Sequence, residues 1–216
     1  MSLQGQIETR CPSCSEAFET PVWSFVHGER DSDLREKVKA RECNLLLCPQ
    51  CGGAFMPEVP WVYYEPGAEI LAFVFPETWR GEESKWRAKM EEDFAQMRAA
   101  LGERLPADMS PEVYFGQEDL GGLLEAEDWR VDERDVMAHY AKDLGLKVYK
   151  ASPRWARAQR APSELPYRGA KPTREALLEG LRALVAANDR LTAWADYLAA
   201  LEKESGAGVP PAAKTK

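Results

Sequence analysis

The sequence predicts an α+β fold in which helices pack beside a small antiparallel sheet and a long helix lies toward the C-terminus. Two Cys-Pro-x-Cys turns, Cys11–Cys14 and Cys48–Cys51, are flanked by short segments with the composition of strands. Residues 61–75 (WVYYEPGAEILAFVF) are rich in aromatic and β-branched side chains on both sides of Pro66-Gly67, as in a β-hairpin. Further along, apolar residues recur every three or four positions, the period of an amphipathic helix.

The first third of the chain is predicted to form strands around the two cysteine turns. Residues 2–10 and 17–26 flank the first turn as strands, and residues 44–47 lead as a short strand into the second. Between them, an Asp-Ser-Asp sequence provides N-cap chemistry for a helix over residues 32–42. The two cysteine pairs can therefore be brought together by a strand, a helix and a second strand.

An amphipathic helix is predicted to begin near Arg80. Its apolar stripe consists of Trp86, Met90, Phe94, Met97 and Leu101. Gly102 and Pro106 are expected to end this helix, because neither residue continues helical structure well. A short strand over residues 113–115 follows.

The second half of the chain is predicted to be helical around an irregular connector. Two helices, over residues 117–127 and 132–145, are separated around Trp129. Residues 146–172 contain several prolines and no clean period, so an extended connector is expected there. A long helix over residues 173–204 then begins just after a proline.

This pattern divides the chain into an α+β domain over residues 1–145, a basic connector over 146–172, a helix over 173–204 and a disordered tail over 205–216. The predicted helix carries a broad leucine-rich stripe that is interrupted by the polar Asn188. A broad stripe favours folding back onto the domain, whereas a polar residue within the stripe is typical of helices that pair between chains. A homodimer through this helix is therefore the alternative.

Composition and charge restrict the class of protein. The formal net charge of −8 argues against a general nucleic-acid-binding protein. The sequence has no run of about 18 apolar residues, so neither a membrane-spanning helix nor a membrane partner is expected. The N-terminal residues lack the pattern of a signal peptide, and an odd number of cysteines does not suit a secreted disulfide scaffold. We therefore expect a cytoplasmic protein.

The four cysteines of the two turns have the pattern of a structural zinc site. Each turn places two sulfurs close together, and Cys11, Cys14, Cys48 and Cys51 supply the four ligands of a tetrahedral zinc ion. Four cysteine ligands leave no open position for water or substrate, so we predict one structural Zn²⁺ in a zinc ribbon. The alternatives are a thioredoxin-like redox pair and buried free cysteines. Cys43 is interpreted as a buried small apolar residue.

Four features of the first half of the chain form a recognisable set. They are the double Cys-Pro-x-Cys motif, Trp23-Ser24, Asp33-Leu34 and the closing Cys48-Pro-Gln-Cys51-Gly. Together they resemble the bacterial CpXC domain, over about residues 7–145 and without the C-terminal helix. The resemblance implies that the four cysteines of the turns bind metal, and it implies no activity because the family is known by its cysteines. The family's glycine-containing turn before the second strand is replaced here by Glu42-Cys43-Asn44.

The sequence shows no motif of catalysis. His27 and His139 lie far apart and outside any metal-ligand or nucleophile pattern. Phosphate-binding loops, dinucleotide-binding fingerprints, nucleophile elbows and zinc-protease motifs are all missing from the sequence. The acidic run from Glu118 to Asp135 is interpreted as a solvated face and not as an acid–base pair. We predict no catalytic residues, and an enzyme with an unrecognised site is the alternative.

A basic belt, defined as residues 147–174, follows the acidic run. It holds eight basic residues and one acidic residue, with aromatic residues between them, and such mixtures can track a phosphate backbone and stack on bases. The candidate contacts to a polyanion are Lys150, Arg154, Trp155, Arg157 and Arg160. The favoured interpretation is that the belt pairs with the acidic segment 117–135, either within the chain or between subunits.

The sequence therefore predicts a non-catalytic, zinc-stabilised interaction module that works through a protein partner. The first alternative is a nucleic-acid-binding or transcription-linked zinc-ribbon factor that uses the ribbon and the basic belt. The second alternative is the enzyme with an unrecognised site.

Overall fold

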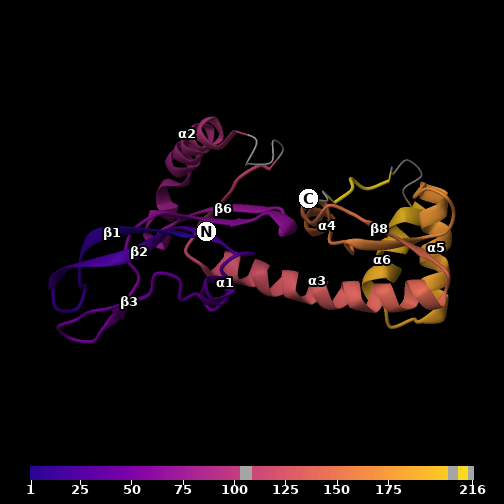
Figure 1. The fold of residues 1–216 in the computed structure, drawn as a ribbon, viewed down its shortest axis with the longest axis horizontal. Helices are drawn as coiled ribbons and strands as arrows, with labels where there is room; N and C mark the ends of the chain where they lie inside the picture. Colours follow the sequence, from indigo (N-terminus) through magenta and orange to yellow (C-terminus); the bar gives the residue numbers. More distant parts are fainter. Residues whose placement is uncertain (103–108, 204–208, 214–216) are drawn as a thin grey trace. The chain divides into compact units, whose positions relative to one another are not determined.

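The computed structural model describes residues 1–102, 109–203 and 209–213. The chain divides into two compact units, Met1–Glu125 and Ala126–Lys216, each with its own hydrophobic core (Figure 1). Helices and strands occur in both units, which confirms the α+β class. The division between the two units falls within the long helix α3 (Glu118–Asp143).

The first unit is built on a five-stranded sheet with the order β1-β2-β5-β6-β7. Its strands are β1 (Leu3–Arg10), β2 (Ala17–His27), β5 (Trp61–Glu65), β6 (Ile70–Phe75) and β7 (Glu112–Phe115). The pairs β2–β5 and β6–β7 are parallel, whereas β1–β2 and β5–β6 are antiparallel. The expected antiparallel sheet is thus corrected to a mixed sheet, because each parallel pair is joined by a long crossover that returns the chain to the same edge of the sheet, so that the second strand runs in the same direction as the first.

The two crossovers carry the remaining elements of this unit. They are α1 (Ser32–Lys39), β3 (Leu46–Leu47), β4 (Ala54–Phe55), η2 (Glu77–Glu82) and α2 (Glu83–Leu101), and a short 3-10 turn, η1 (Pro66–Ala68), closes the β5–β6 hairpin. The first crossover contains the second cysteine turn, between β3 and β4. The predicted hairpin around Pro66-Gly67 and the predicted end of α2 at Gly102 are confirmed.

Strand β6 is buried on both faces and forms the centre of the unit. Ile70, Ala72 and Val74 belong to the core against α1 and the start of α3, whereas Leu71, Phe73 and Phe75 belong to the core against α2. Because successive side chains of a strand alternate between faces, one continuous apolar run can serve both cores. The helices α1 and α2 accordingly lie on opposite faces of the sheet (Figure 1).

Helix α3 corrects the expectation of two helices separated around Trp129. It runs unbroken from Glu118 to Asp143, and no proline or glycine occurs after Gly122 to end it earlier. Trp129 is 72% exposed. The break in the apolar pattern at this residue therefore reflects a solvent-facing side chain and not a turn.

The second unit corrects the expectation of an irregular connector over residues 146–172. This stretch forms β8 (Lys147–Lys150), α4 (Pro153–Gln159) and β9 (Glu164–Tyr167), and the two strands pair antiparallel. Pro153 occupies the first turn of α4, where a missing N–H is tolerated, and Ser152 Oγ caps the helix by accepting a 3.2 Å hydrogen bond from the Trp155 N–H. Pro153 therefore begins a helix in this stretch instead of excluding one.

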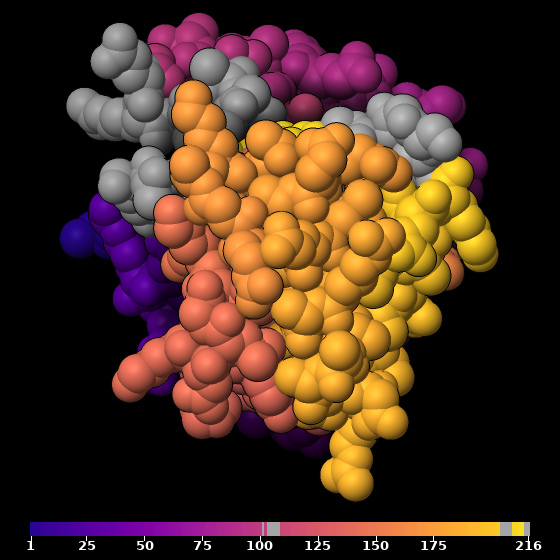
Figure 2. All heavy atoms as spheres, turned by 90° about the vertical axis from the view of Figure 1, so that its right-hand side faces the viewer, coloured from indigo at the N-terminus to yellow at the C-terminus, as the bar shows by residue number. Residues whose placement is uncertain are grey.

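The long helix predicted over residues 173–204 is two helices, α5 (Arg174–Ala187) and α6 (Thr192–Lys203). Asn188 ends α5, since its Oδ1 accepts a hydrogen bond from the Arg190 N–H at 3.0 Å and its Nδ2 donates to the Tyr140 hydroxyl at 2.7 Å. The two helices pack into the core of the second unit. In Figure 2 their residues are coloured orange to yellow. The homodimer through this segment stays a prediction.

Part of the predicted disordered tail is ordered. Residues 209–213 run beside β8, where the Ser152 N–H donates to Pro211 O at 2.8 Å and the Ala213 N–H donates to Lys150 O at 2.7 Å. The rest of that prediction, and the predicted role of Pro106, lie outside the described residues. Among the described helices, none combines the length and the apolar composition that crossing a membrane requires.

Candidate metal centre

Both cysteine turns connect two adjacent antiparallel strands. Cys11 and Cys14 lie in the turn between β1 and β2, and Cys48 and Cys51 lie in the turn between β3 and β4. This placement confirms the strands predicted on either side of the first turn and the strand predicted before the second, although β3 is shorter than expected; β4, after the second turn, was not predicted. Each hairpin therefore presents its two sulfurs at one end.

The first turn is closed by two backbone hydrogen bonds. The Cys11 N–H donates to Glu16 O, and the Ser15 N–H donates to Cys11 O, both at 2.9 Å. Ser15 has a φ of 61°, in the left-handed region that most residues avoid. The turn thus holds an uncommon backbone conformation one residue after its second cysteine.

The second turn repeats this arrangement. The Cys48 N–H donates to Gly53 O, and the Gly52 N–H donates to Cys48 O, again at 2.9 Å. Gly52 has a φ of 70° and takes the place of Ser15, here without a steric penalty because glycine has no Cβ. The two turns are therefore equivalent in backbone hydrogen bonding and in the position of the left-handed residue.

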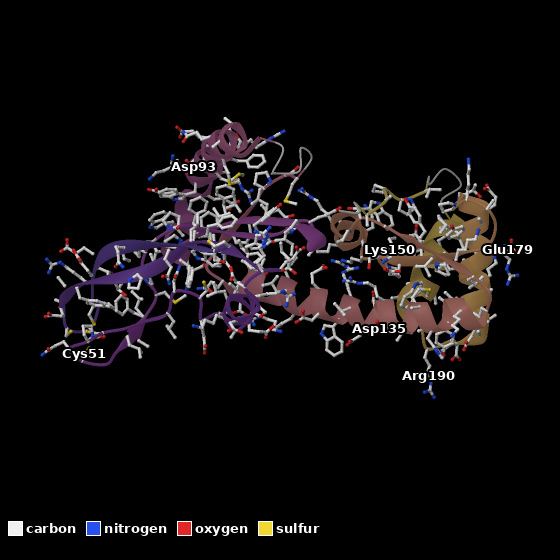
Figure 3. All side chains as sticks on the ribbon, viewed as in Figure 1. Cys51, Asp93, Asp135, Lys150, Glu179 and Arg190 are labelled. Atoms are coloured by element: carbon white, nitrogen blue, oxygen red, sulfur yellow. The ribbon has the colours of Figure 1, made fainter. Side chains whose placement is uncertain are left out.

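The four sulfurs of these turns gather into one cluster, near the label of Cys51 in Figure 3. All four Sγ atoms lie within 4.8 Å of one another; Cys11 Sγ is 3.7 Å from Cys51 Sγ, and Cys14 Sγ is 3.5 Å from Cys48 Sγ. A tetrahedron with metal–sulfur bonds of about 2.3 Å has sulfur–sulfur edges of about 3.8 Å. The spacing therefore fits a single ion between the two turns and is far too long for disulfide bonds, whose length is about 2.0 Å.

Backbone N–H groups favour a thiolate at Cys11. Chiefly the Cys14 N–H, together with the Ser13 N–H at 3.4 Å from the sulfur, lowers the pKa of Cys11 to about 6 against the opposing effect of burial. At Cys14 the Glu16 N–H acts to lower the pKa, but burial and the hydrogen bonds among the neighbouring sulfurs raise it to about 12. Of these two thiols, Cys11 therefore loses its proton more readily than Cys14, and a metal ion that binds both as thiolates must displace the proton of Cys14.

Asn44 attaches the second hairpin to the sheet, and no motif in the sequence marks it as a positioning residue. Its Oδ1 accepts a hydrogen bond from the Trp23 N–H at 2.7 Å, and its Nδ2 donates to Trp23 O at 2.9 Å. Its φ is 61°, which asparagine tolerates better than most residues. Asn44 therefore holds a left-handed backbone position and also ties β2 to the hairpin.

The remaining cysteine and the two histidines lie apart from the cluster. Cys43 is fully buried in the core against α1, and burial raises its pKa to about 12. His27 is buried edge-on against the ring of Tyr64, and His139 is exposed on α3 beside Asp143. Among the described residues, the four cysteines of the turns form the one group of three or more His, Cys, Asp or Glu side chains arranged to hold a metal ion.

The candidate polyanion contacts lie in the second unit. Lys150, labelled in Figure 3, ends β8 with its Nζ 3.7 Å from Glu164 Oε1. Arg157 is largely buried, and its guanidinium lies 3.2 Å from the buried carboxylate of Glu127. The other three candidates are Arg154 and Trp155 on α4 and Arg160 at its C-terminal cap. Arg157 of the basic belt thus pairs with the acidic segment 117–135, whereas Lys150 pairs with Glu164, which lies within the belt.

Comparison with known proteins connects the chain to a family. A family model described as CpXC protein matches residues 9–133, more than half of the chain, and this range contains all four cysteines of the cluster. The match confirms the resemblance carried by the two cysteine turns. No curated protein and no solved structure matches the chain.

Proposed function

The chain belongs to the CpXC family, and we propose that it is a non-catalytic interaction module whose cysteine hairpins are held together by one structural zinc ion. Thiolate ligands favour zinc over harder ions such as magnesium or calcium, and four of them close the coordination shell. A closed shell binds no substrate. The metal then acts by fixing the hairpins, and the function lies on the surface that they present.

A single observation carries the proposal of a protein partner: the outer face of the β3–β4 hairpin is apolar and exposed. Leu45, Leu47 and Met56 are 44%, 68% and 41% exposed. On the opposite face Leu46 is buried, and Phe55 packs edge-on against Phe18. Exposed apolar side chains grouped on one rigid element are typical of a protein-binding surface.

The experiment that tests this proposal compares capture of native partners by Leu47→Glu and by the wild-type chain. A charge in the middle of an apolar interface is expected to abolish capture, because the charged group would have to be desolvated. Val136→Glu is the matched control, since Val136 is another exposed apolar residue, 38% exposed, on α3 of the second unit. Capture that is unchanged by Leu47→Glu, or equally lost in Val136→Glu, would refute the role of this surface.

The nucleic-acid-binding alternative receives less support from the geometry. It depends on the basic belt, yet Arg157 is largely buried against Glu127 and Lys150 lies beside Glu164. Charges that are already paired inside the molecule release fewer counterions on binding a phosphate backbone. We therefore keep the protein partner as the proposed function.

A further inference from the structure

A cavity of about 620 Å³ lies in the first unit, at the base of the β3–β4 hairpin. Trp61, Val74 and Phe75 of the central strands form its apolar part. Asn44 and Met56, which flank the hairpin on either side, also line it. This volume suits a small organic molecule. Asn44, which ties the second cysteine hairpin to β2, is one of the lining residues.

Gln117 supplies a polar group without a complete set of partners. The residue lines the cavity and is 7% exposed. Its Nε2 donates to Cys43 O at 2.7 Å, which fixes the orientation of the amide, and its buried Oε1 accepts no hydrogen bond from the described residues. A buried acceptor without a donor is costly, so a ligand N–H or O–H at this position would be stabilised. Met56, whose Sδ lies 4.0 Å from Nε2, lines the cavity beside this amide with a flexible and 41% exposed side chain.

The rim of the cavity carries more negative than positive charge. Its carboxylates are Glu58, Glu77, Glu118 and Asp119, and its guanidinium groups are Arg41 and Arg80. Arg80 Nε lies 2.6 Å from Glu77, and Arg41 lies 3.3 Å from Glu118, so both cations are already paired with rim carboxylates. The rim therefore favours a cationic ligand and disfavours an anion.

We propose that this cavity binds an organic ammonium ion on a short apolar stem. The stem lies against Trp61 and Val74, the charge is held by the carboxylate rim, and an ammonium N–H satisfies Gln117 Oε1. The same chemistry is offered by a free small amine and by a lysine side chain of another polypeptide. The inference goes beyond the proposed function, because it stands whether or not a protein docks on Leu47.

The test uses the full metal-loaded chain and three probes of equal length: hexylammonium, hexanol and hexanoate. Nuclear magnetic resonance titration is expected to shift the Trp61 indole and the Gln117 side-chain amide with hexylammonium, and to show much weaker shifts with hexanol and none with hexanoate. Equal shifts with hexanoate, or no shift of these two groups with hexylammonium, would overturn the proposal. An N-acetyl-lysinamide probe distinguishes the sources: tighter binding than hexylammonium indicates a polypeptide lysine, and weaker binding indicates a free amine.

A charge-neutralised pair of variants completes the test. Glu58→Gln with Asp119→Asn removes two rim charges and is expected to weaken hexylammonium binding about two- to thirtyfold, given about 0.2–1 kcal/mol for each partly exposed charge contact. Glu179→Gln with Asp189→Asn, two changes in the second unit, is the control and should leave the affinity unchanged. Equal affinities in both double variants would contradict the role of the rim carboxylates in holding the ammonium charge. An unchanged amide spectrum outside the cavity excludes unfolding of the Glu58→Gln, Asp119→Asn variant.

Discussion

At the scale of single residues, the cysteine turns depend on a few uncommon backbone positions. Ser15 and Gly52 take the left-handed conformation at equivalent points of the two turns, and Asn44 takes it just before the second hairpin. The cysteine cluster could be predicted from the sequence because the spacing within each Cys-Pro-x-Cys turn is local. The role of Asn44 could not, because it depends on two hydrogen bonds to Trp23, which lies on another element.

Asn44→Ala is expected to lower the free energy of unfolding by about 2–5 kcal/mol. The variant loses both hydrogen bonds to the Trp23 backbone, at about 0.5–1.5 kcal/mol each, and places a Cβ-bearing residue without a polar side chain in the left-handed region, at about 1–2 kcal/mol. Urea unfolding measures the change. Asn44→Gly keeps the backbone conformation and should lie between wild type and alanine; no loss of stability in either variant would contradict this role.

A buried carboxylate of the second unit should destabilise the fold at neutral pH. Burial raises the pKa of Glu164 above its ordinary value, and Lys150 and Arg134 only partly oppose this shift. A carboxyl group with a raised folded-state pKa stabilises the fold below its unfolded pKa, and that contribution is lost as the pH rises through the folded-state value. Glu164→Gln should therefore be more stable than wild type at pH 7, with the difference shrinking toward pH 4. Thermal unfolding across this range measures it; a variant that is less stable at pH 7 would show that the Lys150 contact dominates, and the exposed Glu179→Gln serves as control.

At the scale of elements, local sequence patterns predicted where most helices and strands lie, but not which strands pair with one another. The apolar run of β6 predicted a buried strand, yet nothing in it indicates that β7 pairs parallel to it across the α2 crossover. The stripe of residues 173–204 predicted helix correctly over most of its length. It did not reveal the break after Asn188, which is stabilised by a hydrogen bond to Tyr140 on α3.

Gly180→Ala is expected to destabilise the second unit by about 1–3 kcal/mol, the cost of overpacking a filled site, despite the better helix propensity of alanine. A Cβ at this position would lie 2.6 Å from the carbonyl carbon of Pro166, where α5 crosses the backbone of β9. Gly122→Ala on α3 is the matched control, since its Cβ would meet nothing within 4 Å. That change should stabilise by up to about 1 kcal/mol. Chemical denaturation compares the two, and equal effects would show that the contact between α5 and β9 is looser than described.

At the scale of the whole molecule, the two units are expected to respond differently to metal removal. The first unit has its own large core around β6, and the second unit has a separate core between β9, α5 and α6. Chelation should therefore speed hydrogen exchange in the two cysteine turns and in β3 and β4, while amides of α5 and β9 keep their rates. Collapse of protection in both units, or no change in the cysteine turns, would contradict a local structural role for the metal.

The candidate sites also differ in how far the sequence could predict them. Four cysteines in two short motifs indicate a metal site without knowledge of the fold. The cavity brings together Arg41, Trp61 and Gln117 from three distant parts of the chain, so it becomes visible only when the sheet, its crossover and α3 are in place. The apolar face of the β3–β4 hairpin likewise requires the pairing of two very short strands.

Metal analysis of purified chains tests directly whether the four clustered cysteines bind one zinc ion. One zinc ion per chain is expected in the wild type and in Cys43→Ser, because Cys43 is buried outside the cluster. Cys48→Ser and Cys11→Ser should lose most of the bound zinc, since an alcohol oxygen is a poor replacement for a thiolate ligand. X-ray absorption should report four sulfur neighbours at about 2.3 Å. A wild-type chain without zinc, or zinc that is retained in both variants, would contradict a structural zinc site at the four cysteines.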